Sequence, residues 1–391
     1  MTIRICGDVE MEKIRIGDVC DILNGYAFKS ENYARSGIRI IRISNVQKGY
    51  IEDTTPAFYP IETADLDRFM LEQGDLLVSL TGNVGRVAIL GKELLPAALN
   101  QRVACLRLKS DKISKNYLFH ILNSNFFEQQ CIMASNGVAQ KNLSTEWLKN
   151  YEVPCYERDQ QEKIVMVLST IQSVILGRKH ELQKLDDLVK ARFVELFGMI
   201  NEDVSLSYYI ASLNAGKSLA GEEENPNKVL KTGAVTYDYF DATQIKNLPM
   251  DYEPQEGHRV KVGDVIISRM NTAELVGAAA YVWDVPEHIY LPDRLWRAEI
   301  KETANPIFVW QVLIQRSTKK SIRRIASGTS GSMKNISKPG LLGIRVVKAP
   351  IKLQEQFAAF VEQTDKSKVA VQKALDEAQL LFDSLMQKYF G

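Results

Sequence analysis

Hydrophobic residues recur at seven-residue intervals in two long stretches of the chain. The first stretch carries one row of apolar positions and a companion row beside it: Leu168, Ile175, Leu182, Val189 and Leu196, with Ile164, Ile171 and Leu185. The second stretch has a similar layout: Phe357, Val361, Leu375, Ala378, Phe382, Leu385 and Tyr389. This spacing is typical of coiled coils. We therefore predict two long helices, over residues 157–198 and 352–391, and each would be a rod of roughly 60 Å.

The ends of the first helix and the flaws in both rows are visible in the sequence. Asp159 suits an N-cap, and Gly198 is a natural helix stop. Polar residues interrupt the two rows of apolar positions: Arg178, Arg192, Thr364 and Lys368. Two helices packed side by side could each fill the gaps of the other, so we expect an antiparallel coiled coil. The alternative is that each helix packs only on its own domain.

The segments outside these helices predict a mixture of strands and helices. Short or alternating apolar runs predict strands at residues 39–46, 75–79, 103–108 and 264–268,. Two further segments, 117–131 and 306–325, have a helical pattern. The expected fold class is α+β, with two mixed α/β domains in tandem. Each domain is followed by a long helix, and the two halves would be related by a pseudo-two-fold axis.

The two halves of the chain repeat one another. NGVAQKNLS ends at Ser144 and SGSMKNIS ends at Ser337, which places Lys141 and Lys334 in register. The separation between Lys141 and Lys334 also carries Gln161-Glu162 onto Gln354-Glu355. Gly74-Asp75 aligns with Gly263-Asp264 at a slightly smaller separation. A repeat of this length indicates duplication of whole domains. We predict a first domain at 1–156, a first helix at 157–198, a second domain at 199–351 and a second helix at 352–391.

Composition narrows the class of protein without identifying it. The 391 residues are 45% hydrophobic and 25% charged, and the net charge is +1, so any basic surface must be local,. The five cysteines all lie in the first half, and none forms a C-x-x-C: Cys6, Cys20, Cys105, Cys131 and Cys155. This argues against a disulfide framework or a thiolate zinc site. No apolar run resembles a signal peptide or a membrane span. We expect a soluble cytoplasmic protein without a metal or cofactor.

Several motifs, in their order along the chain, resemble those of one known family. They are Ile16-Gly-Asp-Val19, GDLLVSLTGNVGRVAIL at 74–90, LNQRVACLRL at 99–108, the two Lys-Asn turns, and the Val153-Pro154 and Ala349-Pro350 entries into the helices. Together with the duplication, they resemble the specificity subunit of type I restriction-modification enzymes, over nearly the whole chain. The second half departs from the pattern, because it reads SRMNTAELVGAAAYV where the first reads SLTGNVGRVAI.

The resemblance implies a DNA-reading subunit without catalytic residues. Its two domains would be target recognition domains, each reading one half of a split DNA sequence. Its helices would form an antiparallel spacer that docks methyltransferase subunits, of which we expect two, and restriction or translocase subunits are further possible partners. We expect five apolar residues of the helices to take part in this docking: Leu168, Ile175, Leu182, Leu375 and Phe382.

Basic and amide side chains supply the candidate DNA contacts. Residues 316–348 contain nine Lys or Arg and no Asp or Glu, which suits phosphate binding,. Arg suits guanine and Asn or Gln suits adenine at base edges. The candidates are Arg42, Asn45, Lys48, Arg86, Gln101, Arg102, Lys141, Asn142, Arg269, Arg294, Lys319, Lys320, Arg323, Arg324, Lys334 and Asn335. A solvated surface is the alternative for the basic run. The Lys-Asn turns could equally set the exit of each domain toward its helix.

A metal-dependent nuclease is the alternative function. Pro292-Asp293 followed by Glu299-Ile300-Lys301 imitates a PD…E-x-K site, with Asp293 and Glu299 as metal ligands and Lys301 beside them. The first half has no matching carboxylates between Gln101 and Leu108, which favours the non-catalytic reading. The four histidines are scattered without ligand spacing,.

Overall fold

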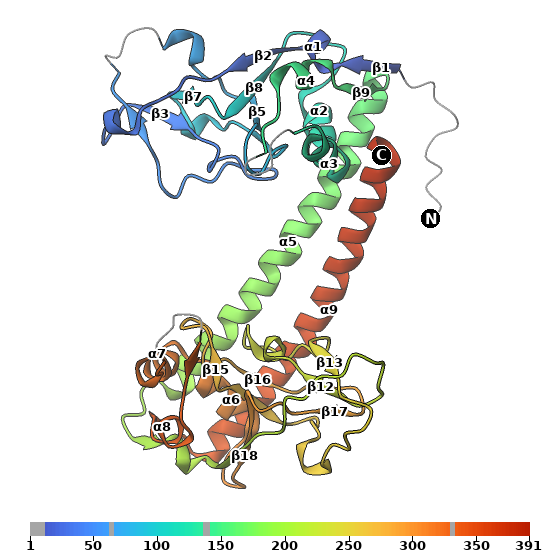
Figure 1. Ribbon diagram of the computed structural model, residues 1–391. Coiled ribbons are helices and arrows are strands. Elements are labelled where there is room, and N and C mark those ends of the chain that lie inside the picture. Colours follow the sequence, from blue (N-terminus) through green and yellow to red (C-terminus); the bar gives the residue numbers. More distant parts are fainter. Residues whose placement is uncertain (1–11, 62–65, 136–140, 329–332) are drawn as a thin grey trace. The chain divides into compact units, whose positions relative to one another are not determined.

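The computed structural model describes residues 12–61, 66–135, 141–328 and 333–391 (Figure 1). The opening residues of the two Lys-Asn motifs, 136–140 and 330–332, lie outside the described residues, as does Cys6. The chain divides into two compact units. The first consists of Met1–His180 with Gln372–Gly391, and the second of Glu181–Val371. Each unit therefore contains a part of both long helices, α5 (Arg158–Phe197) and α9 (Ile351–Phe390).

The first unit is built on two small sheets. Its elements are β1 (Glu12–Arg15), α1 (Ile16–Val19), β2 (Cys20–Asn24), β3 (Ile38–Ile41), β4 (Phe58–Tyr59), β5 (Leu76–Ser79), β6 (Val87–Ile89), β7 (Ala97–Leu99), β8 (Val103–Leu108), α2 (Lys115–Leu122), α3 (Asn125–Ala134), α4 (Thr145–Asn150) and β9 (Glu152–Cys155). A four-stranded antiparallel sheet has the order β2-β8-β5-β6, and a three-stranded sheet has the order β4-β3-β7. β1 pairs with β9, directly before α5.

The second unit repeats this plan. Its elements are β10 (Asp203–Ser205), β11 (Ile210–Asn214), β12 (Lys228–Leu230), β13 (Ile245–Asn247), β14 (Val265–Ser268), β15 (Met270–Asn271), β16 (Ala279–Tyr281), β17 (Ile289–Tyr290), β18 (Leu295–Ile300), α6 (Pro306–Ile314), α7 (Arg316–Ile325), β19 (Lys334–Asn335), α8 (Lys338–Leu342) and β20 (Arg345–Val347). The sheets have the orders β11-β18-β14-β16 and β13-β12-β17, and β10 pairs with β20 before α9. The duplication read from the sequence is thus a duplication of topology, and the α+β class is confirmed.

The central strands are continuous apolar runs because both faces of the sheet are buried. In β5, Leu76 and Val78 pack into one hydrophobic cluster, whereas Leu77 packs into another on the opposite face. Successive side chains of a strand point to opposite faces, so a strand covered on both sides carries apolar residues at consecutive positions. In β14, Val265 and Ile266 divide in the same way. This explains the paired Gly-Asp-apolar motifs.

The two long helices pack antiparallel. In the second unit, Lys368 of α9 pairs with Asp186 of α5, while Phe357, earlier in α9, contacts Phe197, later in α5. In the first unit, the end of α9 joins the cluster that contains the beginning of α5: Ile164, Leu168, Met386, Tyr389 and Phe390. The predicted rows of apolar residues are therefore the contact surface between the helices.

The polar interruptions of the rows find partners in the opposite helix or in the helix backbone. The guanidinium of Arg192 lies 5.8 Å from the ring centroid of Phe360, and Lys368 pairs with Asp186. Thr364 is 5% exposed, and its hydroxyl donates to the carbonyl of Phe360 at 2.8 Å. Packing the two helices together therefore supplies partners for Arg192 and Lys368, whereas Thr364 bonds within its own helix.

Three elements differ from the sequence expectation. The strand predicted at 39–46 ends at Ile41, because the chain turns there and Asn45 N–H bonds back to the carbonyl of Arg42 at 2.9 Å. The helices predicted at 117–131 and 306–325 are each two helices, interrupted at Ser124 and Gln315. Ser124 caps the second helix by accepting from Phe127 N–H at 3.0 Å, a local hydrogen bond that periodicity does not reveal,.

The start of α5 lies within one residue of the expected segment, but the predicted N-cap at Asp159 is wrong. The helix begins at Arg158, and the carbonyl of Glu157 accepts from Gln161 N–H at 3.0 Å. Asp159 therefore lies in the first turn, where a carboxylate still interacts favourably with the helix dipole. The stop at Gly198 is confirmed: its N–H donates to the carbonyl of Val194 at 2.8 Å after the last helical residue.

A buried histidine predicts how the first unit responds to acid. His120 of α2 is 4% exposed, its Nε2 lies 3.2 Å from Ser169 Oγ of α5, and burial lowers its pKa from 6.5 to about 4. The unfolded chain binds this proton near pH 6.5 but the folded chain only near pH 4. The contribution of His120 to the free energy of unfolding should therefore be fully present above pH 6.5. It should fall by about 3 kcal/mol as the pH drops to 4.

Urea unfolding of the full chain at pH 7.5 and at pH 4 measures this loss. His120→Gln should reduce the difference in unfolding free energy between the two pH values. His180→Gln, on the exposed face of α5, is the matched control and should leave it unchanged. An equal acid sensitivity in the His120→Gln variant and the wild type would contradict the assignment.

Candidate nucleic-acid interface

The turn after β3 contains three of the predicted DNA contacts. Asn45 is 3% exposed, because its Oδ1 accepts from Arg42 N–H at 2.9 Å and its Nδ2 donates to the carbonyl of Glu52 at 2.8 Å. Arg42 Nη2 donates to the carbonyl of Thr55 at 2.5 Å. These contacts hold the turn itself. Asn45 is therefore placed where it shapes the turn, with its amide directed away from solvent.

Lys48 and Arg86 link the same turn to its neighbours. Lys48 Nζ lies 2.6 Å from Glu128 Oε2 and 2.6 Å from Asn125 Oδ1, both on α3. Arg86, directly before β6, donates to the side-chain carbonyl of Gln47. The structure thus brings Arg42, Lys48 and Arg86 together around one turn.

The turns that precede β8 and β18 carry the next candidates. Gln101 and Arg102 are exposed between β7 and β8, and Arg294 is exposed at the equivalent place before β18. Arg269 is more enclosed. Its guanidinium lies 5.7 Å from the ring centroid of Trp296, and its Nη1 donates to the carbonyl of Asp293 at 3.5 Å. Equivalent turns therefore present a cation to solvent in both units.

The two Lys-Asn turns fix the backbone in the same way in both units. Asn142 forms an isolated β-bridge with Thr81, and Asn335 pairs with Met270. Each motif thus pairs through its backbone with the residues that follow the central strand of the four-stranded sheet. Lys141 is exposed, whereas Lys334 Nζ donates to the carbonyl of Gly328 at 2.7 Å. The repetition of the motif has a backbone reason, whatever its lysines bind.

In each repeated Gly-Asp motif, the aspartate joins a turn to the neighbouring strand through an ion pair. Asp75 accepts from Glu72 N–H at 2.8 Å and from Arg107 Nη2 at 2.7 Å. Asp264 accepts from Lys261 N–H at 2.9 Å, and its Oδ2 lies 3.6 Å from Arg297 Nη1. In both units the pair joins the turn before the central strand to the neighbouring strand. Hydrogen bonding to Asp75 raises the pKa of the Arg107 guanidinium, so the guanidinium stays charged.

The repeated glutamines join each domain to its long helix. Gln161 is fully buried, accepts from Ser114 N–H at 2.8 Å and donates to the carbonyl of Lys112 at 2.8 Å. Gln354 is 1% exposed and accepts from Asn305 N–H at 3.0 Å. The donors belong to the N-caps of α2 and α6. The Gln-Glu motif is therefore a structural joint and needs no ligand to explain it.

The basic run forms α7, whose cations differ in their surroundings. Thr318 and Ile322 face the core, and the cations lie on the other side of the helix. Lys319 is ion-paired with Asp238, and Arg323 lies 3.4 Å from Glu274 Oε2. Within the described part of the chain, no ion-pair partner faces the exposed side chains of Lys320 and Arg324. Arg316, at the start of α7, is likewise exposed and without an ion pair among the same residues, so these three are the cations that α7 offers to an anion.

The apolar residues expected to dock a partner lie inside the chain's own packing. Leu168 is 0% exposed, Ile175 6% and Leu375 8%, while Leu182 and Phe382 are partly buried. A side chain that is buried between the helices cannot also contact another protein. The long helices expose a different set of apolar residues: Met166, Val174, Leu176, Leu188, Val194, Ile351, Val369, Leu380 and Leu381.

The nuclease-like residues are not brought together. Glu299 Oε2 accepts from Ser212 Oγ at 2.8 Å, and Lys301 Nζ donates to the carbonyl of Ser207 at 2.8 Å. Asp293 precedes β18 and Glu299 lies near its end, so the strand separates them by roughly 13 Å or more. Metal ligands must lie within about 2–2.6 Å of one ion. Among the described residues, no group of three or more His, Cys, Asp or Glu could hold a metal ion.

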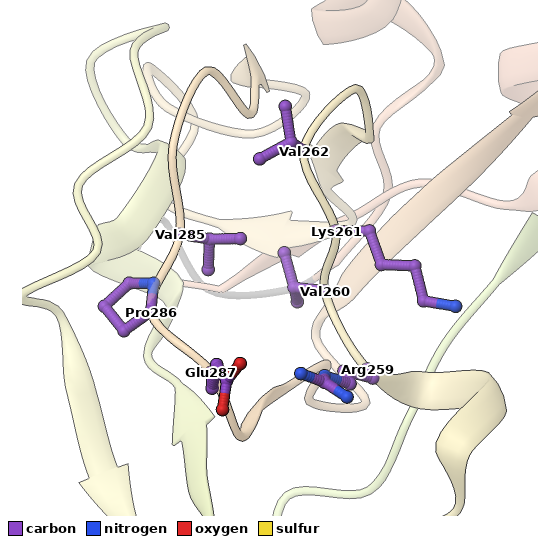
Figure 2. Close-up of a pocket in the computed structure, with 7 residues that line it drawn as sticks. All are labelled: Arg259, Val260, Lys261, Val262, Val285, Pro286 and Glu287. Carbon is purple, nitrogen blue, oxygen red and sulfur yellow. The ribbon is translucent and has the colours of Figure 1, made fainter.

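A shallow hollow of 290 Å³ in the second unit offers no catalytic set either. Figure 2 shows Val260 and Val285 facing each other across it, with Lys261 directed away. Its lining contains no serine, cysteine or histidine.

Among the helices that the structure describes, none combines the length and apolar character needed to cross a membrane.

The sequence reasoning missed three exposed tyrosines. Tyr50 is 58% exposed, Tyr237 72% and Tyr239 56%. Tyr237 and Tyr239 stack with an interplanar angle of 17°. Large aromatic residues at the tip of a turn, beside Gly49 or Asp238, were the available signal. Tyr50 lies in the turn that follows β3, and Tyr237 and Tyr239 lie in the turn that follows the equivalent strand, β12.

Comparison with known proteins finds a family model that matches the first half of the chain. Residues 8–186 match the family described as "Type I restriction modification DNA specificity domain". The chain is 27% identical over 186 residues to the type I restriction enzyme MjaVIII specificity subunit of Methanocaldococcus jannaschii, a match that covers 46% of this chain and 44% of that protein. It is 32% identical over 160 residues to the EcoAI specificity subunit of Escherichia coli, covering 39% and 27%. The matched region thus spans less than half of each relative.

Solved structures extend the likeness to the fold of the whole chain. The crystal structure of the type I restriction-modification system S subunit from M. genitalium superposes with a TM-score of 0.61 at 16% identity, over 100% of this chain and 98% of that one. A chain from a structural study of complex assembly and conformational transition of the type I restriction-modification system gives 0.55 at 16% identity, over 97% of both chains. At this identity the likeness concerns the fold: two sheet-based domains, each followed by a long helix.

The separation of Asp293 from Glu299 makes the nuclease alternative testable. The purified chain with Mg²⁺ should leave supercoiled plasmid uncut, and Asp293→Ala and Glu299→Gln should each behave as the wild type. Gel analysis of nicked and linear plasmid measures this. Mg²⁺-dependent nicking that both substitutions abolish would revive the metal site.

Proposed function

We propose that this chain, whose residues 8–186 match the family model of type I restriction-modification DNA specificity domains, is the DNA sequence-recognition subunit of such a system. Each sheet-based domain reads one half of a split DNA target. The observation that carries the proposal is the duplicated topology. The two units repeat the same strand orders and the same ion pair between the Gly-Asp turn and the neighbouring strand. A duplicated reader within one chain does what two-fold dimeric readers achieve with two chains. The chain has no catalytic role in this proposal.

The phosphate contacts of the second domain come mainly from Lys320 and Arg324. Both are exposed on the outer face of α7, and the described residues place no carboxylate against them. Arg294 and the turn at Gln101 and Arg102 are further contacts, and Lys141 is exposed in the Lys-Asn turn of the first domain. Arg42, Lys48, Arg86, Arg269, Lys319 and Arg323 have partners within the chain, and in this proposal they shape the interface.

The long helices serve as the spacer and as the docking surface for methyltransferase subunits. Each is a continuous helix of 40 residues, or about 60 Å,. Docking uses the exposed apolar residues of the helices, such as Leu176 and Leu380, which are 61% and 73% exposed. Isolated exposed apolar residues are common, but a series of them along two helices fits a partner surface. The cytoplasmic location and any restriction subunits follow from this assignment.

The exposed cations of α7 should account for part of the salt dependence of DNA binding. Replacing Lys320 and Arg324 by Ala should weaken binding to all duplexes alike. It should also reduce the slope of log Kd against log salt by about 0.9 for each phosphate that the variant no longer neutralises. Replacing the ion-paired Lys319 and Arg323 should change the slope less.

Fluorescence anisotropy with duplex DNA at several salt concentrations measures the slope. Lys179→Ala with Lys184→Ala removes the same charge from the exposed face of α5 and is the matched control. A slope that the control lowers as much as the α7 variant would mean that net charge alone is responsible. An unchanged slope in the α7 variant would show that this helix faces away from DNA.

The spacer role predicts that helix length sets the distance between half-sites. Inserting seven residues after Leu182, and seven after its counterpart Leu375, keeps both apolar rows in phase. It lengthens each helix by roughly 10 Å, about three base pairs. Selection of duplexes from a random library should return the same half-sites with a longer unread spacer. An insertion in α5 alone should reduce binding, because the helices no longer match. Recovery of the original spacer by the double insertion would disprove the spacer role.

A further inference from the structure

Two turns occupy equivalent places in the two units. In the first unit the turn follows β3, and in the second it follows β12. Val46 and Val235 are both 0% exposed and anchor the turns in the core. Three residues beyond these anchors, Gly49 and Asp238 both have positive φ, 90° and 66°. The two turns thus share a buried anchor and a positive-φ residue at the same spacing, although the sequences VQKGY and VTYDY differ.

Each turn is tied to the first residue of the equivalent edge strand. Gly49 N–H donates to the carbonyl of Val87, which begins β6, at 2.9 Å. In the second unit, Ala279 begins β16, and its N–H donates to Asp238 Oδ1 at 3.2 Å. The same connection is therefore made by a backbone group in one unit and by a side chain in the other.

Each turn is also tied by an ion pair to the equivalent helix, with the charges exchanged. In the first unit the turn supplies the cation, since Lys48 pairs with Glu128 of α3. In the second unit the turn supplies the anion, since Asp238 pairs with Lys319 of α7. Glu128 and Lys319 occupy the same place in their helices, the fourth residue in each case.

The exchange of signs shows what the pair does. The second turn has Tyr237 at the place of Lys48 and supplies a carboxylate from the next residue, Asp238, which DNA would repel, so a phosphate contact is not what the two turns have in common,. What the two units share is the attachment of turn to helix, whichever side carries the positive charge. Both pairs are partly shielded, with the four side chains between 22% and 40% exposed, so screening by salt is reduced but not removed,.

The attached turns present tyrosines to solvent. Directly after the positive-φ residue come Tyr50 in the first unit and Tyr239 in the second, both more than half exposed. Tyr239 stacks on Tyr237, and the pair flanks Asp238, whose partner Lys319 is next to the exposed Lys320. Tyrosine combines a rigid flat ring with a hydroxyl that donates and accepts, and it loses little conformational entropy on contact.

We propose that Lys48–Glu128 and Asp238–Lys319 are positioning contacts that present Tyr50 and Tyr239 to the DNA half-site read by their own domain. The inference rests on the proposed function and adds the residues that determine specificity. The two tyrosines contact duplex DNA, and the ion pairs contact only the protein.

The tyrosines are tested with the full chain and a random duplex library. The wild type is first used to select its split sequence, and anisotropy then gives Kd for duplexes with either half-site scrambled. Tyr50→Ala should lower affinity about tenfold and remove the discrimination at one half-site only. Tyr239→Ala should do the same at the other half-site. Tyr208→Ala, a 43% exposed tyrosine outside the turn, is the control and should change neither.

The ion pairs are tested by reversing charges. Lys48→Glu and Glu128→Lys should each reproduce the loss seen with Tyr50→Ala, and the double variant should restore it. Hydrogen exchange of residues 44–50 should accelerate in the single variants and return to the wild-type rate in the double variant. Asp238→Lys with Lys319→Asp gives the same test in the second unit.

The outcomes separate this inference from the proposed function. A wild-type chain that enriches no sequence would overturn both. A wild type that selects a split sequence, with tyrosine variants that discriminate it equally well, would overturn only the inference. Weak DNA binding by the double charge reversal, with normal hydrogen exchange, would mean that Lys48 binds DNA directly and that the positioning role is wrong.

Discussion

The burial of two incomplete apolar rows against each other is the constraint on which the rest of this structure depends. Neither α5 nor α9 has an uninterrupted row, and the polar gaps of one helix find partners in the other, as Arg192 does in Phe360 and Lys368 in Asp186. Isolated helices derive little stability from propensity alone, so packing decides their stability. Each compact unit therefore needs a part of both helices, and the helix that follows one domain also completes the core of the other unit.

The sequence predicted best those features that periodicity or repetition encodes. The bounds of α5 and α9 lie within one residue of the expected segments, and β8 and the central strands were found as apolar runs. The duplication was read from the Lys-Asn, Gln-Glu and Gly-Asp motifs. The structure explains their persistence: each fixes a backbone joint, through Gln161, Asp75 or their counterparts. Motifs that repeat for structural reasons are informative about architecture and uninformative about ligands.

The site was less predictable, because its residues depend on partners far away in the sequence. Asn45 had the right chemistry for reading adenine, yet its amide is used by the turn. Lys319 and Lys320 are adjacent and identical in sequence terms, but among the residues that the structure describes only Lys319 has a carboxylate beside it, from a turn 81 residues away. Local patterns give the charge of a segment. They cannot say which charges are already neutralised by the fold.

The exchanged charges between turn and helix also restrict how the two halves of the chain can be recombined. A chimaera that took the turn of the first domain and the helix of the second would set Lys48 against Lys319. The reverse chimaera would set Asp238 against Glu128. Either juxtaposes like charges in a partly shielded place, where repulsion is costly. Exchange of a segment shorter than a whole domain would therefore separate the turn from the helix with which it pairs. Inheritance of intact domains keeps turn and helix matched.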